Sequence, residues 1–356
     1  MSLPVHVITG FLGAGKTSLL RRLLALPELG DTAVIVNELG EAGLDHLLVE
    51  EVLAEDVVLL KSGCVCCSVR GDLKAALIAL MERRRRGEIP AFARVAVETT
   101  GIADPGPIAA TLIADPMLRH QARMGNIVTV VDVPNGLTNL DAFPEALAQI
   151  AAADRLVVTK ADLASAAETD RLAARLAALN PTASILRLTE RDTPDADLLL
   201  SDPGNEDARK AEVTRWLAAA ARPHAFRADP HPDIAAFVLR AKMPIAWPRF
   251  ALWLSMLLNR HGANVLRLKG VLDLEGVESP VVIQGVQHQI HAPQHLAAWP
   301  GPRETTIVVI AKRLDPALVK RSFRAFVAPG AHAPLVPAKA VTQAAPAAAG
   351  CPPSRG

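Results

Sequence analysis

The chain has 356 residues, half of them apolar, and a formal net charge of +1 at pH 7. At about 100–200 residues per domain, this length suits two domains with a sizeable core. Aromatic residues make up only 3% of the chain and tyrosine is absent, which argues against an aromatic-lined nucleic-acid surface, so we expect no nucleic-acid partner.

The N-terminal residues MSLPVHVITG carry no export signal that we recognise, and their apolar residues are already used by the first predicted strand. The most apolar later stretch, 250–258, is too short to cross a bilayer, which needs about 20 residues. We therefore expect no membrane association and a cytoplasmic location. In that reducing compartment the four cysteines are poor candidates for disulfides.

A phosphate-binding loop is predicted at the start of the chain. The apolar run 5–8 is typical of a buried parallel strand, and GFLGAGKT after it matches G-x-x-x-x-G-K-[ST]. Leucines at helical spacing follow, so the loop lies between a strand and a helix N-terminus, where anions bind; a glycine turn without a ligand is the alternative. Lys16 would reach the outer phosphates of a nucleotide and Thr17 would offer its hydroxyl to Mg²⁺. The predicted phosphate-binding residues are Gly10, Gly13, Ala14, Gly15, Lys16, Thr17 and Ser18.

A second strand, 32–36, leads into the polar loop NELGEAGLD, residues 37–45. Ligands of open α/β sheets bind beyond the carboxyl ends of the strands. The loop is therefore either a solvated acidic loop or a switch segment that responds to a γ-phosphate.

Three of the four cysteines, Cys64, Cys66 and Cys67, follow a third predicted strand at 57–60. Adjacent residues of an extended chain point to opposite sides, so the three thiols converge only in a loop. Clustered thiolates suit Zn²⁺ or Co²⁺, whereas packing as small apolar side chains is the alternative. A fourth ligand must come from water, a histidine, a partner protein or a carboxylate, for which Glu41 is a candidate.

A helix at 72–81 ends in the basic run 83–86, which we interpret as a solvated helix C-terminus. The next strand, 94–97, delivers Glu98, and Gly101 follows in the sequence ETTG. In P-loop proteins an acid at this place supports Mg²⁺, and a nearby glycine senses the γ-phosphate.

A guanine-recognition motif is predicted after the strand at 156–158, where Thr159, Lys160 and Asp162 fit [N/T]-K-x-D. An aspartate there accepts two hydrogen bonds from guanine N1 and its amino group, a donor pair that adenine lacks; an ordinary helix cap is the alternative. The nucleotide is therefore predicted to be GTP. The other elements predicted in this half are strands at 125–132 and 184–188 and helices at 142–153, 166–179 and 212–220.

The composition changes at a proline-rich connection, beyond which strands and helices predict a small α+β domain. We place a P-loop domain at 1–222, a linker at 223–233, a second domain at 234–327 and a disordered alanine- and proline-rich tail at 328–356. The elements expected in the second domain are strands at 235–239, 265–272, 281–284 and 307–311 and helices at 247–258 and 316–326.

Histidines of the second half rank below the cysteines as metal ligands. His288, His291 and His295 are close in sequence, but His288 and His291 would fall on opposite faces of a strand. His224 and His231 lie in the proline-rich connection, where histidines are usually solvated.

Taken together, GFLGAGKT, VNELGEAGLD, SGCVCCSVRGDL, ETTGIADPGP, TKAD, LRLKGVL and QGVQHQI closely resemble the CobW-like P-loop GTPases, relatives of the HypB and UreG nickel-insertion GTPases. The resemblance covers the chain to about residue 326. It implies an α/β P-loop NTPase domain, with a mainly parallel sheet flanked by helices, and a smaller C-terminal α+β domain. It also implies slow GTP hydrolysis, zinc or cobalt at the C-x-C-C loop, and delivery of metal to a client metalloenzyme or metal-insertion complex, with a homodimer as one arrangement.

Carried over residue by residue, the resemblance gives Lys16, Thr17 and Glu98 the catalytic and Mg²⁺ roles and Lys160 with Asp162 the guanine role. Three departures stand out: Thr159 replaces the commoner asparagine, Val36 replaces a glutamate of some relatives, and a long histidine-rich insertion is missing. No catalytic glutamine or arginine finger is identifiable, so slow hydrolysis is expected. A passive zinc buffer and a P-loop kinase acting on a small molecule are the alternative functions.

Overall fold

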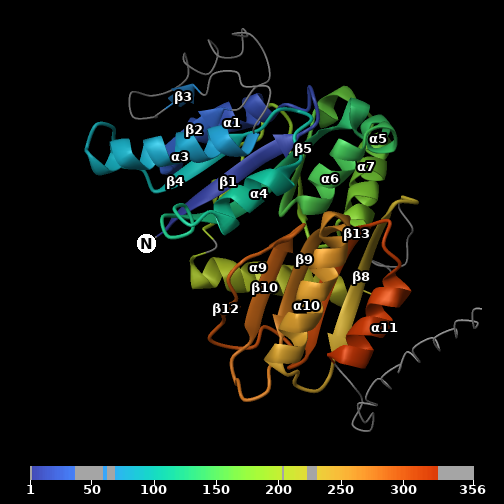
Figure 1. Cartoon of the computed structure of the whole chain (residues 1–356). Coiled ribbons are helices and arrows are strands. Elements are labelled where there is room, and N and C mark those ends of the chain that lie inside the picture. The colour runs from blue at the N-terminus through green and yellow to red at the C-terminus, as the bar shows by residue number, and fades with distance from the viewer. Residues whose placement is uncertain (1, 37–58, 62–68, 203, 223–230, 328–356) are drawn as a thin grey trace, which may run out of the picture.

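The structure, a computed structural model, describes residues 2–36, 59–61, 69–202, 204–222 and 231–327. These residues form a parallel sheet flanked by helices, followed by an antiparallel sheet with its own helices (Figure 1). The predicted α/β domain with a smaller α+β domain is therefore confirmed. The domain bounds remain a prediction, and the predicted tail falls outside the described residues.

In the described part of the chain the first sheet has seven strands in the order β3-β2-β4-β1-β5-β6-β7, and every neighbouring pair is parallel. Short apolar runs form these strands because both sheet faces are covered. Register places Ile8 beside Glu98 and Asp132 beside Thr159, so the loops after these strands share one edge. The strands are β1 Leu3–Gly10, β2 Thr32–Val36, β3 Leu59–Lys61, β4 Arg94–Glu98, β5 Ala122–Asp132, β6 Arg155–Thr159 and β7 Ser184–Arg187.

Helices cover both faces of this sheet. The buried leucines of α1 pack with α8 on one face, while α3 and α4 pack on the other. Apolar spacing at three and four residues puts these side chains on one helix face. The helices are α1 Lys16–Leu24, α3 Val69–Arg85, α4 Pro105–Ala114, α5 Val133–Ala142, α6 Pro144–Ala152, α7 Ala166–Leu179 and α8 Ala196–Leu199, with short 3-10 turns η1 Pro27–Leu29 and η2 Ala161–Leu163.

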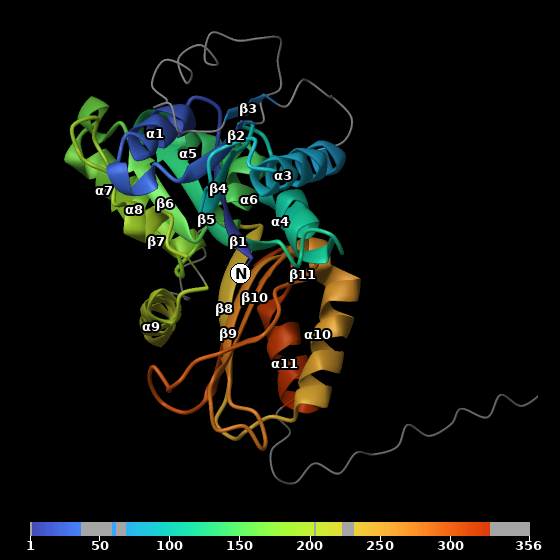
Figure 2. The same ribbon diagram turned by 90° about the vertical axis from the view of Figure 1, so that its left-hand side faces the viewer.

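The second sheet is antiparallel, and its two faces carry different helices (Figure 2). α10 and α11 pack on one face, and α9 packs on the other through the fully buried Trp216. Its strands are β8 Ile234–Ala241, β9 Val265–Leu272, β10 Val281–Val286, β11 Gln289–Ile290, β12 Gln294–His295 and β13 Thr305–Lys312. Its helices are α9 Glu206–Ala221, α10 Trp247–His261 and α11 Pro316–Phe326, with η3 Gly262–Asn264 as a 3-10 turn.

The two sheets share part of a core. Ile234, Leu266 and Ile310 of the second sheet join the apolar cluster formed by α5, α6, α7 and strand β6. None of the described helices is both long and apolar enough to cross a membrane.

β1 and β5 lie close together at Gly10, which has φ = +140°. A Cβ there would lie 2.2 Å from the carbonyl oxygen of Val130. We predict that Gly10→Ala lowers the free energy of unfolding by at least about 3 kcal/mol, because backbone strain and overpacking add. Urea denaturation followed by circular dichroism measures the loss.

Gly87→Ala is the matched control, because Gly87 also has positive φ (+70°) but no atom lies within 4 Å of its added Cβ. Its expected loss is only about 1–2 kcal/mol. Equal losses for the two variants would contradict the close approach of β1 to β5.

Candidate nucleotide site

The predicted phosphate loop curls between β1 and α1. Gly10, Gly13 and Gly15 have φ values of +140°, +73° and +97°, which glycine adopts without a Cβ penalty. Gly15 is the N-cap of α1, and no side chain caps the first turn. Because the first N–H groups of a helix need acceptors, this helix start fits an anion such as a nucleotide phosphate.

Two oxygen-bearing side chains meet beside this loop. The Thr17 hydroxyl donates a hydrogen bond of 2.6 Å to Oε1 of Glu98. Glu98 is only 1% exposed and stands at the end of β4, next to β1. Lys16 lies at the start of α1 with its Nζ 3.3 Å from the Phe11 carbonyl oxygen. Hydroxyl and carboxylate oxygens are ligands that Mg²⁺ prefers, so this pair fits the predicted metal.

The predicted guanine motif contacts the phosphate loop directly. The Thr159 hydroxyl donates to the Ala14 carbonyl at 2.8 Å, and Lys160 Nζ donates to the Gly13 carbonyl at 2.7 Å. Lys160 has φ = +57°, which is uncommon outside glycine and marks functional sites. Asp162 lies on the exposed turn η2, and Ser18 is exposed in the first turn of α1.

Asp132 is a member of this site that the sequence did not single out. It is 1% exposed, and its Oδ2 accepts a 2.6 Å hydrogen bond from Asn135. The same oxygen lies 3.8 Å from Lys160 Nζ. Asp132 therefore orients the lysine of the motif. Its position at the end of a buried strand was the sequence feature that could have identified it as a site residue.

The loop after β4 is fixed on two sides. Gly101 is buried against the phosphate loop, where an added Cβ would lie 2.7 Å from the backbone nitrogen of Leu12. Gln149 of α6, 1% exposed, donates to the carbonyls of Gly101 and Ala103 at 3.1 and 3.0 Å. Sequence reasoning missed Gln149, although a glutamine on the apolar face of an alanine-rich helix was a signal.

The same loop contacts the second domain. Asp104 caps α4 by accepting from the Gly106 N–H at 2.8 Å. Its other oxygen accepts a 2.7 Å hydrogen bond from Gln287, in the turn between β10 and β11. A hydrogen-bonded contact thus joins the strand-end loop beside the nucleotide site to the second sheet.

The predicted metal ligands Cys64, Cys66, Cys67 and Glu41 lie outside the described residues, as does the polar loop 37–45. Among the residues that are described, no group of three or more His, Cys, Asp and Glu is placed to hold a metal ion.

Two histidines of the second half, His288 and His291, are placed differently from expectation. β11 spans only Gln289–Ile290, so neither His288 nor His291 lies within a strand as predicted, because the chain turns at this hairpin. His295 shares a 2.8 Å hydrogen bond with the Ser279 hydroxyl, and His231 accepts from the Asp233 N–H.

Comparison with known families gives two matches. The family described as "CobW/HypB/UreG, nucleotide-binding domain" matches residues 4–187, and "Cobalamin synthesis protein cobW C-terminal domain" matches residues 234–327. Together they span both sheets.

Individual relatives agree with this assignment. The chain is 32% identical over 322 residues to the zinc chaperone YjiA of Escherichia coli, covering 90% of this chain and 98% of the relative. It is 37% identical over 218 residues to the zinc-regulated GTPase metalloprotein activator 1 of Schizosaccharomyces pombe, covering 59% and 52%. A crystal structure of a Zn(II)-bound triple mutant of the YjiA GTPase superposes with a TM-score of 0.71 at 26% identity, covering 92% of this chain and 99% of that one.

The contact between Gly101 and the phosphate loop predicts the effect of Gly101→Ala. The added Cβ forces the Leu12 backbone to move, so GDP and GTP affinities should fall about tenfold while the protein stays folded. Titration with a fluorescent guanine nucleotide measures this. Gly30→Ala is the control, since its nearest atom would be 3.5 Å away; unchanged affinity in Gly101→Ala would show that the loop does not support nucleotide binding.

Proposed function

Because the chain belongs to the CobW/HypB/UreG family of P-loop GTPases, we propose that it is a GTP-driven zinc carrier. In this proposal it binds Zn²⁺, with Co²⁺ as a second candidate, at the Cys64, Cys66 and Cys67 loop and delivers the ion to a client metalloprotein. Delivery depends on whether GTP or GDP is bound.

The observation that best supports the GTP site is the meeting of three loops at one edge of the parallel sheet. The loop after β1 holds the glycines, the end of β4 holds Glu98, and the end of β6 holds Thr159 and Lys160. In an open α/β sheet, ligands bind at this edge. The glycines suit the phosphates, the carboxylate suits Mg²⁺, and the threonine and lysine belong to the motif that would hold the guanine base.

In the proposed site, backbone N–H groups around Gly13 and Gly15 hold the phosphates, and Lys16 offsets their negative charge. Thr17 and Glu98 hold Mg²⁺, which when bound neutralises charge on the transferred phosphate. Lys160 packs along the base and Asp162 accepts from its N1–H and amino group. These residues only position the nucleotide and stabilise charge on its phosphates. None of them activates the attacking water, which agrees with slow hydrolysis.

The proposed gate is the loop that Gly101 begins. A γ-phosphate would contact this loop where the loop touches the phosphate loop. A shift of the loop would then move Gln149 of α6 and Gln287 of the second sheet, which are hydrogen-bonded to it. The Cys64–Cys67 segment lies in sequence between the phosphate loop and Glu98. By linkage, a nucleotide that changes zinc affinity is itself bound differently when zinc is present.

Support for zinc as cargo comes from the relatives. The E. coli relative is a zinc chaperone, and the S. pombe relative is a metalloprotein activator. Thiolates bind Zn²⁺ only after losing their protons, so loading and release both respond to local charge. The client is expected to be a metalloprotein that receives the ion through its own thiolate, histidine or carboxylate ligands.

Base recognition predicts the effect of Asp162→Asn. Xanthine carries a carbonyl where guanine carries its amino group, so an asparagine amide can donate to xanthine while its oxygen still accepts from N1–H. The substitution should weaken GTP binding by about tenfold or more and strengthen XTP binding. Asp207→Asn, on the exposed start of α9, is the charge-matched control. Equal losses for GTP and XTP would contradict this role of Asp162.

The cargo site predicts the effect of Cys66→Ala. Removing one thiolate of three should abolish one tightly bound Zn²⁺ per chain, measured by competition with a chromophoric chelator. Cys351→Ala removes a thiol from the alanine- and proline-rich C-terminal segment and should leave the stoichiometry unchanged. Full zinc binding by Cys66→Ala would reject the C-x-C-C loop as the cargo site.

A further inference from the structure

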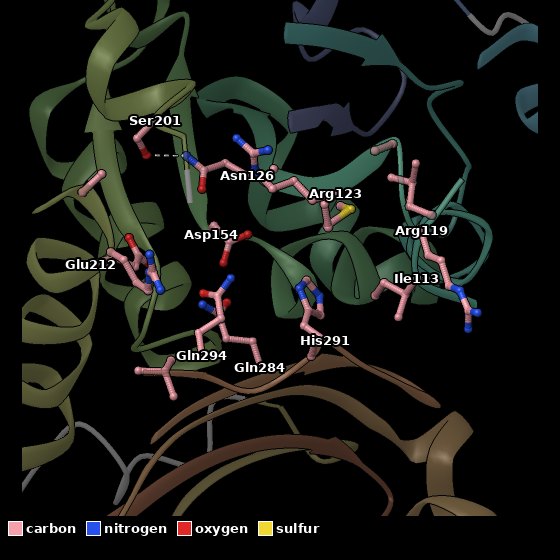
Figure 3. Close-up of a pocket in the computed structure, with 18 of the residues that line it drawn as sticks. Ile113, Arg119, Arg123, Asn126, Asp154, Ser201, Glu212, Gln284, His291 and Gln294 are labelled. Atoms are coloured by element: carbon pink, nitrogen blue, oxygen red, sulfur yellow. Dashed lines mark hydrogen bonds between the residues drawn. The ribbon is translucent and has the colours of Figure 1, made fainter. Parts of the chain in front are cut away.

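A cleft lies between the two sheets, away from the nucleotide site. Its cavity volume is about 200 Å³, and its walls come from α4, the start of β5, α9, β9 and β10. Figure 3 shows Asp154 from the first domain facing Gln284 and His291 from the second, with Glu212 of α9 to one side.

The cleft and the nucleotide loops are at opposite edges of the parallel sheet. Arg123 lies at the start of β5, whereas Asp132, beside Lys160, lies at its end. At about 3.3 Å per residue, the nine steps between them span about 30 Å. A ligand of the cleft is therefore distinct from GTP.

A buried cluster of charges adjoins the cleft, and three of its members, Asp154, Glu212 and Arg267, line it. Lys269, with no exposed surface, contacts Asp154 at 2.8 Å and Glu212 at 2.9 Å. Arg267, 2% exposed, also pairs with Asp154, and Arg155, 1% exposed, pairs with Glu212 at 2.6 Å. Three buried cations thus face two carboxylates.

Asp154 and Glu212 are both ionised, so each contributes a negative charge to the cluster. Burial alone would raise the pKa of Asp154, but Arg267 and Lys269 outweigh it and hold the pKa well below its usual range. Burial likewise opposes ionisation of Glu212, yet Lys269 and Arg155 lower its pKa to about 2. Each of the three cations contacts a carboxylate, but the buried cluster carries one more positive charge than negative charges.

Arg267 is the cation whose hydrogen bonds are incomplete. Its Nη2 donates to Asp154 and to Gln284, whereas Nε and Nη1 are buried with no hydrogen-bond partner among the described residues. The neighbouring His291 does not compensate, because burial, and then Arg267, lower its pKa to about 4 and keep it neutral. Guanidinium groups desolvated in this way favour an added anion.

The rim of the cleft adds further positive charge. Arg119 and Arg209 line it and have no carboxylate partner in the described part of the chain; Arg209 donates only to two backbone carbonyls. Of the other two lining arginines, Arg123 pairs with Asp202 and Arg267 with Asp154, so the excess positive charge of the wall comes from Arg119 and Arg209. Between the arginines the wall is apolar, with Ile113, Met124 and Val282.

We propose that this cleft, lined by Arg119, Arg209 and Arg267, binds a small organic anion whose carboxylate or phosphate group is attracted by these arginines and whose apolar part packs on Ile113, Met124 and Val282. Because Arg119 comes from the first domain and Arg267 from the second, the bound anion bridges the two. A cavity of about 200 Å³ is smaller than most drug-sized pockets, so the ligand is a small anion of few heavy atoms.

The test is isothermal titration of the full chain saturated with GDP and Mg²⁺, so that the phosphate loop is filled. The probes are glutarate and inorganic phosphate, each at constant ionic strength. We expect saturable binding of one anion per chain, and Arg119→Gln with Arg209→Gln should weaken it at least about tenfold. Neither substitution touches the buried ion cluster, so both variants should fold.

The matched control is Arg249→Gln with Arg260→Gln, which removes the same charge from exposed positions on α10 and should leave binding unchanged. Binding of glutarate alone identifies a carboxylate site, and binding of phosphate alone identifies a phosphate site. Absence of saturable binding of either probe up to about 10 mM, or equal weakening by the two double variants, overturns the proposal.

Discussion

The parallel register of β4, β1, β5 and β6 is the constraint on which the nucleotide site depends. Because all four strands run the same way, the loops after them emerge at one edge, although they come from residues 10–17, 98–101 and 159–162. The Thr17–Glu98 hydrogen bond and the contacts of Thr159 and Lys160 with the phosphate loop are consequences of this arrangement. An antiparallel partner in the middle of this sheet would send one loop to the far edge.

α4 links that edge to the rest of the molecule. Its first turn is capped by Asp104, which also binds Gln287 of the second sheet, and its last turn contributes Leu112 and Ile113 to the interdomain cleft. A shift of the loop at Gly101 would therefore act on a helix that contacts the second domain at its start and lines the interdomain cleft at its end. Packed helices shift as units, so α4 is placed to carry such a shift to the second domain.

Much of this architecture could be predicted from the sequence. Apolar runs beside the motif glycines predicted most strands of the parallel sheet. The alternation of strands and helices predicted that the motif loops share one edge. α4 and α5 were missed because each has a proline and a glycine within its first four residues, a pattern typical of loops. Pro105 instead occupies the first turn of α4, where its missing N–H costs nothing.

Long-range partners were beyond the reach of sequence reasoning. The alternation in LRLKGVL is typical of a strand with one solvated face, yet Arg267 and Lys269 are buried because the first domain and α9 cover that face. Gln287 lay unremarked in a turn, since nothing local indicates that Asp104, 183 residues away, is its partner. The cysteine loop remains a prediction from sequence and resemblance.

The most direct test of a GTP-gated zinc carrier is the equilibrium affinity for Zn²⁺, measured by chelator competition with GDP bound and again with a non-hydrolysable GTP analogue bound. Gating through the Gly101 loop predicts at least about a fivefold difference between the two affinities, which Cys66→Ala removes. Equal zinc affinity in the two nucleotide states would contradict the carrier mechanism and leave a GTPase whose cysteine loop only buffers zinc.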